Sequence, residues 1–137
     1  MLVDDDPLIR ESVADVLELE GYAIAPASTG EAALTALTLG ATPSTLILDL
    51  WLPGMGSVAF LRTLRARPGG RIPVIILTAW PAVERLDLDA DAYLLKPADA
   101  AAIVRAVDRL VRGGRRRSPQ KARNRRPRAV FGVGQAT

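Results

Sequence analysis

The chain has 137 residues, 49% of them hydrophobic, which is enough for one domain with a buried core. It contains neither cysteine nor histidine, so a disulfide framework is excluded and any metal must be held by oxygen ligands, which favours Mg²⁺, Ca²⁺ or Mn²⁺ over zinc or copper. The net charge of +3 averages two unlike regions, because eight of the 18 basic residues and none of the 15 acids lie in residues 113–137. That segment carries +8 and residues 1–112 carry −5.

Apolar runs alternate along the chain with segments of helical periodicity, which is typical of a parallel α/β sheet. We predict strands over residues 1–3, 22–27, 45–50, 73–78 and 92–95. Predicted helices follow each strand, from Pro7 to the stop at Gly21, over 30–39 and 58–67, over a short and weak segment at 83–88, and from about Asp99 to Gly113. Asp6 followed by Pro7 is a helix-capping pattern. No run is long enough to span a membrane and no signal peptide pattern is present, so we expect a soluble, cytoplasmic protein.

Charged residues stand at the ends of three predicted strands. Asp4 and Asp5 follow the first strand, Asp49 ends the third, and Lys96 follows the fifth. A buried carboxylate is costly unless something pairs with it, and the carboxyl ends of parallel strands meet at one edge of a sheet. The pattern therefore predicts a site in which these acids and the lysine converge.

Four short motifs occur in order at these strand ends: Val3-Asp4-Asp5-Asp6-Pro7, Leu48-Asp49-Leu50 with Leu52-Pro53-Gly54-Met55, Ile76-Leu77-Thr78-Ala79 and Leu95-Lys96-Pro97. Together they resemble the receiver domain of bacterial two-component response regulators over about residues 1–112. The resemblance implies a flavodoxin-like (βα)5 fold, a doubly wound five-stranded parallel sheet with strand order 2-1-3-4-5, here with a shortened fourth helix. Residues 113–137 would then be a basic tail, which its charge and few apolar residues predict to be disordered.

The resemblance also implies a phosphorylation switch that uses Mg²⁺. Asp49 matches the phospho-accepting aspartate, and Asp4 and Asp5 match the acidic pair that binds the metal together with Asp49 and the backbone carbonyl of Trp51. Mg²⁺ takes hard oxygen ligands, and a divalent cation relieves the repulsion among crowded carboxylates.

Further roles follow from the same resemblance. Thr78 matches the hydroxyl residue that turns toward the phosphoryl group, Lys96 the lysine that pairs with it, and Tyr93 the aromatic switch residue. In the family the bond corresponding to Lys96–Pro97 is typically cis. The expected partner is a sensor histidine kinase or phosphotransfer protein, and the chain would be a signalling receiver that assists its own phosphorylation and dephosphorylation rather than an enzyme. A homodimer through the fourth helix, fifth strand and fifth helix is a further expectation.

The chain departs from the family pattern at two places. It has Gly56-Ser57 where Asp-Gly is usual, and we expect Ser57 to cap the following helix. Thr78 and Lys96 are 18 positions apart, about four fewer than is common, which is roughly one helical turn. The second departure puts the output face in question more than the phosphoryl chemistry.

Two other functions compete with the phospho-accepting receiver. One is a degenerate receiver that acts only as a protein-interaction module, which the shortened fourth helix favours and the intact acids, Thr78 and Lys96 oppose. The other is a Mg²⁺-dependent phosphohydrolase with an aspartyl nucleophile. Such enzymes commonly carry an acid two residues after the nucleophile, where this chain has Trp51.

The arginine-rich tail has three interpretations that the sequence leaves open. It is a solvated linker, a nucleic-acid contact, or an end without a selected function. Arginine suits phosphate binding, but no aromatic residue lies among the arginines, which argues against base stacking.

Overall fold

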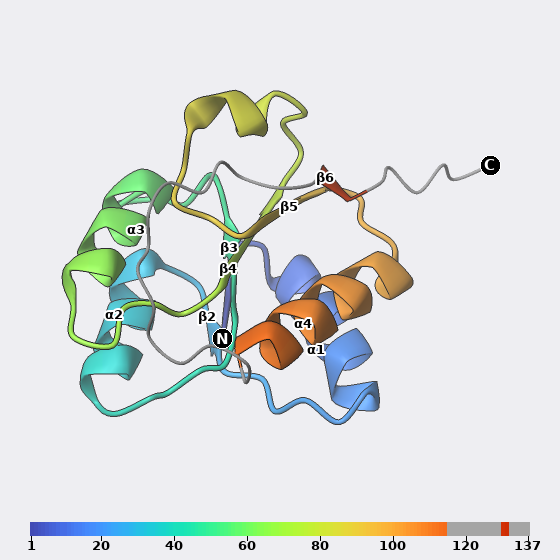
Figure 1. Ribbon diagram of the computed structural model, residues 1–137, viewed down its shortest axis with the longest axis horizontal. Helices are drawn as coiled ribbons and strands as arrows, with labels where there is room; N and C mark the ends of the chain where they lie inside the picture. The colour runs from blue at the N-terminus through green and yellow to red at the C-terminus, as the bar shows by residue number, and fades with distance from the viewer. Residues whose placement is uncertain (115–129, 132–137) are drawn as a thin grey trace.

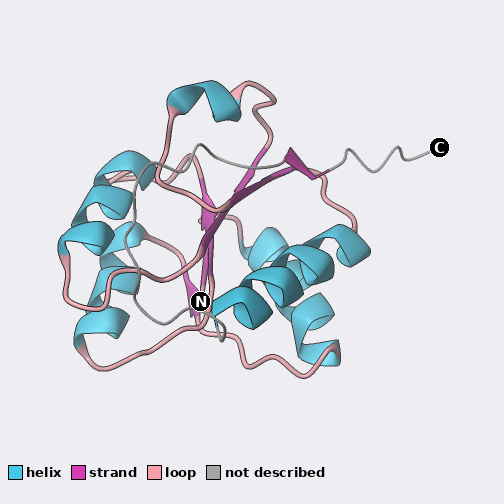
Figure 2. Ribbon diagram, viewed as in Figure 1, coloured by secondary structure: helices cyan, strands magenta, loops and turns pink. Residues whose placement is uncertain are grey.

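The computed structural model describes residues 1–114 together with Val130 and Phe131. Its centre is a parallel sheet, the magenta layer in Figure 2, with the order β2-β1-β3-β4-β5-β6. The strands are β1 (Leu2–Val3), β2 (Pro26–Ala27), β3 (Leu46–Asp49), β4 (Val74–Thr78), β5 (Ala92–Leu95) and β6 (Val130–Phe131). The predicted order 2-1-3-4-5 is confirmed, and β6 is a sixth strand that the sequence did not lead us to expect.

Within the described residues, four α-helices cover the two faces of the sheet (Figure 1). They are α1 (Pro7–Leu19), α2 (Gly30–Thr38), α3 (Ser57–Ala66) and α4 (Ala100–Gly114). The α2 and α3 helices pack on one face, and α1 and α4 on the other, so that β3 and β4 are buried along their whole length. Burial on both faces explains why β4 reads as an unbroken run of apolar residues before Thr78.

Local signals set the start of most helices. Asp6 accepts a hydrogen bond from the backbone amide of Leu8 and Pro7 occupies the first turn, which confirms the predicted cap. Thr29 caps α2 through the amide of Ala32, and Asp99 accepts from the amide of Ala102 at the start of α4. Each of these caps starts a helix directly after the loop that leaves the carboxyl end of a strand: β1, β2 or β5.

Two predicted elements are shorter than expected. Regular pairing in the second strand is confined to Pro26–Ala27 instead of residues 22–27. The short, weak helix predicted over 83–88 is present only as a single 3₁₀ turn, η1 (Val83–Leu86), which Asp87 ends in the left-handed conformation at φ 48°. With 18 positions between Thr78 and Lys96, part of which is needed for β5, too little chain is left for a packed α-helix.

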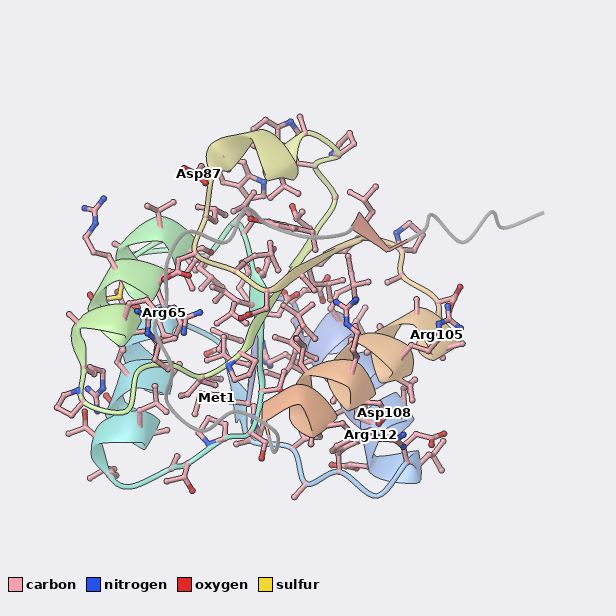
Figure 3. All side chains as sticks on the ribbon, viewed as in Figure 1. Met1, Arg65, Asp87, Arg105, Asp108 and Arg112 are labelled. Atoms are coloured by element: carbon pink, nitrogen blue, oxygen red, sulfur yellow. The ribbon has the colours of Figure 1, made fainter. Side chains whose placement is uncertain are left out.

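The connection from η1 to β5 is held by Arg65 of α3, labelled in Figure 3. Its guanidinium donates to the backbone carbonyls of Gly70 and Ile72, both at 2.7 Å, and of Asp89 at 2.9 Å. It also forms an ion pair with the Asp89 carboxylate at 3.1 Å. One side chain thus joins the end of α3, the turn after it and the loop that enters β5.

The predicted tail over residues 113–137 lies mostly outside the described residues. Gly113 and Gly114 end α4, close to the predicted helix stop, and Val130–Phe131 pair in parallel with Tyr93 and Leu94 of β5. Within the described part of the chain, no helix is long and apolar enough to cross a membrane.

Candidate functional site at the carboxyl edge of the sheet

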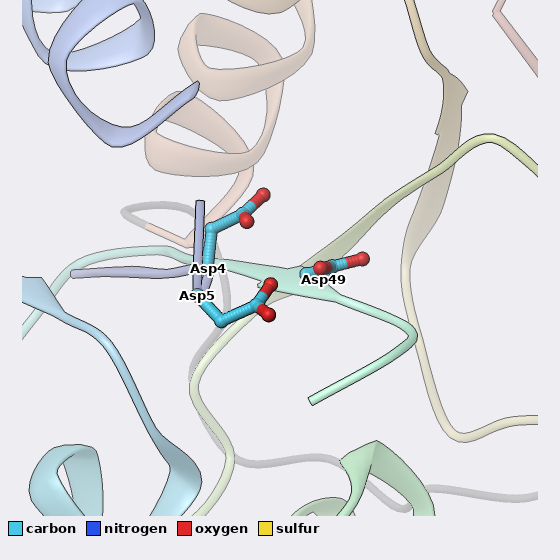
Figure 4. A group of neighbouring side chains, drawn as sticks. All are labelled: Asp4, Asp5 and Asp49. Carbon is cyan, nitrogen blue, oxygen red and sulfur yellow. The ribbon is translucent and has the colours of Figure 1, made fainter. Parts of the chain in front are cut away.

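Three carboxylates converge where β1 and β3 end (Figure 4). Val3 is in register with Leu48, so Asp4 and Asp49 leave neighbouring strands at the same level. The ligand oxygens of Asp4, Asp5 and Asp49 lie within 4.8 Å of one another. Asp4 and Asp49 are buried and Asp5 is exposed, so the cluster opens to solvent on one side. The structure thus confirms the predicted convergence of these three acids.

Lys96, the residue after β5, reaches into this cluster. Its ammonium lies 2.8 Å from Asp4 Oδ2 and 3.5 Å from Asp49 Oδ1. The backbone holds Lys96 beside β4, because the Lys96 amide donates to the Thr78 carbonyl at 2.8 Å. The Lys96–Pro97 bond is cis, as the resemblance implied. The lysine therefore supplies positive charge to two buried carboxylates from the far side of β4.

Burial raises the pKa of Asp49, and the negative charge of Asp4 raises it further. The ammonium of Lys96 and the backbone amide of Trp51, which donates to Asp49 Oδ1 at 3.3 Å, act in the opposite direction. The pKa of Asp49 is raised overall, because the attraction of the Lys96 ammonium is smaller than the combined effect of burial and neighbouring negative charge. A further cation in the cluster would favour the ionised carboxylate.

The donor set suits magnesium. All three side chains offer carboxylate oxygens, which Mg²⁺ prefers at about 2.1 Å. Opposite ligands on one ion are then about 4.2 Å apart, so small side-chain rotations would bring oxygens that lie within 4.8 Å onto a common ion. The residues present therefore fit a bound Mg²⁺ ion.

Thr78 ends β4 one position beyond the residue that pairs with Asp49 and is fully buried. Its hydroxyl accepts from the backbone amide of Trp80 at 3.2 Å. The indole rings of Trp51 and Trp80 meet with centroids 6.3 Å apart and planes tilted by 48°. Both rings are exposed, so an apolar pair of side chains stands beside the acidic cluster at the surface.

Tyr93 lies deeper in the fold than the other predicted site residues. Its side chain is almost wholly buried in the core cluster that α2 and α3 cover, and its hydroxyl donates to the Leu88 carbonyl at 3.3 Å. The ring thus lies beneath the connection that contains η1. Whether it acts as a switch residue stays a prediction.

Three contacts at the site were not expected from the sequence. Arg10 of α1 donates to the Asp4 carbonyl at 2.7 Å, and Glu31 of α2 accepts from the Met55 amide at 2.9 Å. Ser57 donates its hydroxyl to the Asp49 carbonyl. The position of Arg10 one turn after the Asp6 cap could have placed it near β1, since a helical side chain points back toward the N-terminus. Nothing in the local sequence signals the other two contacts, which depend on how loops from different elements meet.

Comparison with known proteins gives one consistent result. The family model described as the response regulator receiver domain matches residues 1–108. The chain is 40% identical over 101 residues to the DNA-binding response regulator MtrA of Mycolicibacterium smegmatis, an alignment that covers 71% of this chain and 43% of that protein. The chain spans about half the length of the curated relatives it matches.

Solved structures agree. The signal receiver domain of a signal transduction histidine kinase from Syntrophus aciditrophicus is 32% identical with a TM-score of 0.77, and the match covers 88% of this chain and 95% of that one. The receiver domain of a sensor histidine kinase from Pseudomonas aeruginosa is 28% identical with a TM-score of 0.73, over 80% of this chain and 93% of that one. In that structure a magnesium ion is coordinated in the active site cleft.

Proposed function

Because the chain belongs to the family of response regulator receiver domains, we propose that it accepts a phosphoryl group on Asp49 in a two-component signalling system. The donor would be a phosphohistidine of a sensor kinase or phosphotransfer protein. The observation that supports this most is the meeting of Asp4, Asp49 and Lys96 at one edge of the sheet.

The proposed transfer uses the groups as they lie. A carboxylate oxygen of Asp49 attacks phosphorus, the bond from phosphorus to the donor nitrogen breaks, and the leaving imidazole keeps the electron pair of that bond. Lys96 stabilises negative charge on the transferred oxygens, and the Thr78 hydroxyl, after turning from the Trp80 amide, donates to one of them. Mg²⁺ held by Asp4, Asp5, Asp49 and the Trp51 carbonyl would neutralise charge on the same oxygens.

Attack of water on the acyl phosphate would return Asp49 to its free form. The same lysine, hydroxyl and metal would assist that step, so the chain would catalyse changes of its own state instead of turning over a substrate. In this proposal Tyr93 responds when Thr78 moves, because the two residues lie on adjacent strands β5 and β4.

The test is labelling with a small phosphodonor such as acetyl phosphate. We expect acyl phosphate to form on one residue, to require Mg²⁺ and to be absent from Asp49→Asn. Asp15→Asn, which removes an exposed acid of α1, is the matched control. Labelling of Asp49→Asn at the wild-type level would show that the acceptor is elsewhere. A folded wild type that takes no label would favour a protein-interaction module.

Other partners remain predictions. MtrA is named as a DNA-binding protein, but this chain covers less than half of it, and the basic residues that would contact nucleic acid lie in residues 113–137. A homodimer through the face of η1, β5 and α4 would have to form without a full fourth helix, since η1 is one turn.

A further inference from the structure

Ser57 is the first residue of α3, and its side chain is almost completely buried. A buried hydroxyl needs a partner, since burying it unpaired is costly. Its partner is the backbone carbonyl of Asp49, eight positions earlier. The hydroxyl therefore links the start of a helix to the end of the strand that presents the proposed phosphoacceptor.

The predicted helix cap at Ser57 is wrong, and the local backbone shows why. Gly56 occupies the cap position with φ 61°, a conformation that favours glycine, and it has no side chain to cap with. Ser57 is thereby moved into the first turn. Its hydroxyl donates to the Asp49 carbonyl at the end of β3 and not to a backbone group of α3.

The bond closes the loop that leaves β3, residues 50–56. This loop contains Trp51, whose amide donates to the Asp49 carboxylate and whose carbonyl is a proposed metal ligand. A second tie lies further along, where Glu31 accepts from the Met55 amide. Of the two, only the Ser57 bond acts on Asp49 itself.

We propose that Ser57 is a positioning residue for the phosphoacceptor. By holding the Asp49 carbonyl it fixes the backbone from which both the Asp49 carboxylate and the Trp51 carbonyl are directed at the metal. This inference rests on the proposed function for its meaning, but the arrangement of metal ligands that it predicts is measurable without phosphorylation.

The experiment measures Mg²⁺ binding by calorimetry in wild type, Ser57→Ala and Ser57→Gly. Both variants remove the hydroxyl, and we expect both to weaken Mg²⁺ binding about threefold to tenfold, the effect of losing one buried hydrogen bond. They differ in helix propensity and hence in stability, because glycine is a poor helix former. Equal weakening in two variants of unequal stability separates positioning from a general loss of structure.

Thr63→Ala is the matched control on the same helix. It removes a hydroxyl that donates to the Ala59 carbonyl at 2.9 Å on the exposed side of α3, and Mg²⁺ affinity should stay at the wild-type value. In the labelling assay, the Mg²⁺ concentration for half-maximal rate should rise in both Ser57 variants by the same factor as the calorimetric dissociation constant.

Unchanged Mg²⁺ affinity in Ser57→Ala would overturn the proposal. An affinity that follows stability through the series, so that Ser57→Gly is much weaker than Ser57→Ala, would also overturn it. If wild type binds Mg²⁺ but takes no phosphoryl group, the proposed function fails while the calorimetric comparison still decides the role of Ser57.

Discussion

Two connections leave the carboxyl edge of the sheet side by side, residues 50–56 after β3 and residues 79–91 after β4. They begin in the same way. Each carries a tryptophan two positions after a proposed site residue, and each tryptophan amide donates back to that residue's side chain, Trp51 to Asp49 and Trp80 to Thr78.

The two connections then differ in where they are fixed. The first is tied next to the site, by Ser57 to Asp49 and by Glu31 to Met55. The second contains a single 3₁₀ turn and is tied at its far end, where Arg65 holds the loop before β5. This fold therefore fixes the geometry of the acids locally, but it holds the connection after β4 by a contact that is distant from them.

Lys96 contacts Asp49 and Thr78, the residues from which the two connections start, and replacing it by methionine should have the largest effect. Loss of the ammonium removes charge stabilisation from the transferred oxygens, so the rate of acyl phosphate formation should fall by about 100-fold or more. Rapid-quench labelling with acetyl phosphate at saturating Mg²⁺ measures this rate.

Arg105→Met is the control for that change. Arg105 is an exposed cation of α4, labelled in Figure 3, and its removal alters net charge equally. A similar fall in both variants would mean that overall charge, and not the Lys96 contacts, sets the rate.

Arg65→Ala should remove the contacts that hold residues 79–91 near the start of β5. Three backbone carbonyls lose a charged donor, and Asp89 loses its ion-pair partner, so the free energy of unfolding should fall by about 2–3 kcal/mol. Urea denaturation measures the loss. Mg²⁺ affinity should change little, because the first connection keeps its own ties.

Arg62→Ala, which removes an exposed arginine from the same helix, should cost less than about 0.5 kcal/mol. If Arg65→Ala weakened Mg²⁺ binding as strongly as Ser57→Ala, the two connections would not be fixed independently.

Asp49→Asn should stabilise the chain without metal, and the gain should depend on pH. Because the pKa of Asp49 is raised in the folded chain by burial and by Asp4, the ionised carboxylate costs stability above the folded pKa. The gain should be full above the folded pKa, shrink as the pH falls through the folded pKa, and vanish below the ordinary value of 3.8. Urea midpoints in EDTA from pH 7 to pH 3.5, compared with Asp15→Asn, measure it. A gain that grew toward low pH would have the wrong sign.

The smallest expected effect concerns Trp51 and Trp80, one of which lies in each connection. If the indoles crowd the approach of water to a phosphoryl group on Asp49, the acyl phosphate should be long-lived, and Trp51→Asn/Trp80→Ala should lose it several-fold faster. Decay of labelled protein after removal of the donor measures the lifetime. An unchanged lifetime in the double variant would mean that both rings fold outward, away from the path of water.

Much of the fold was predictable because it depends on local signals. The alternation of apolar runs and helical segments predicted five of the six strands in the described sheet, β1 to β5, and Asp6 with Pro7 located the start of α1. Strand ends also placed Asp4, Asp49 and Lys96 together, since the edge of a parallel sheet collects whatever follows its strands.

What could not be predicted depends on contacts between distant segments. The apolar residues from 22 to 25 suggested a longer second strand, but Tyr22 and Ile24 pack against the core cluster that α1 and α4 contribute to, and the ladder with β1 begins only at Pro26. The partner of Ser57 depends on the conformation of Gly56, and β6 depends on a pairing with β5 across more than 30 residues of chain. Such contacts leave no periodic pattern in the sequence.

The tryptophan pair gives this edge of the sheet an intrinsic fluorescence signal. The chain has only two tryptophans, and they are Trp51 and Trp80, with ring centroids 6.3 Å apart beside the acidic cluster. Tryptophan emission should therefore arise at this one edge of the molecule, and a charge that enters or leaves the cluster should act on both emitters at once. If the chain binds Mg²⁺ and accepts a phosphoryl group as proposed, this emission should report on both without a label, and replacing one indole at a time should separate the contributions of Trp51 and Trp80.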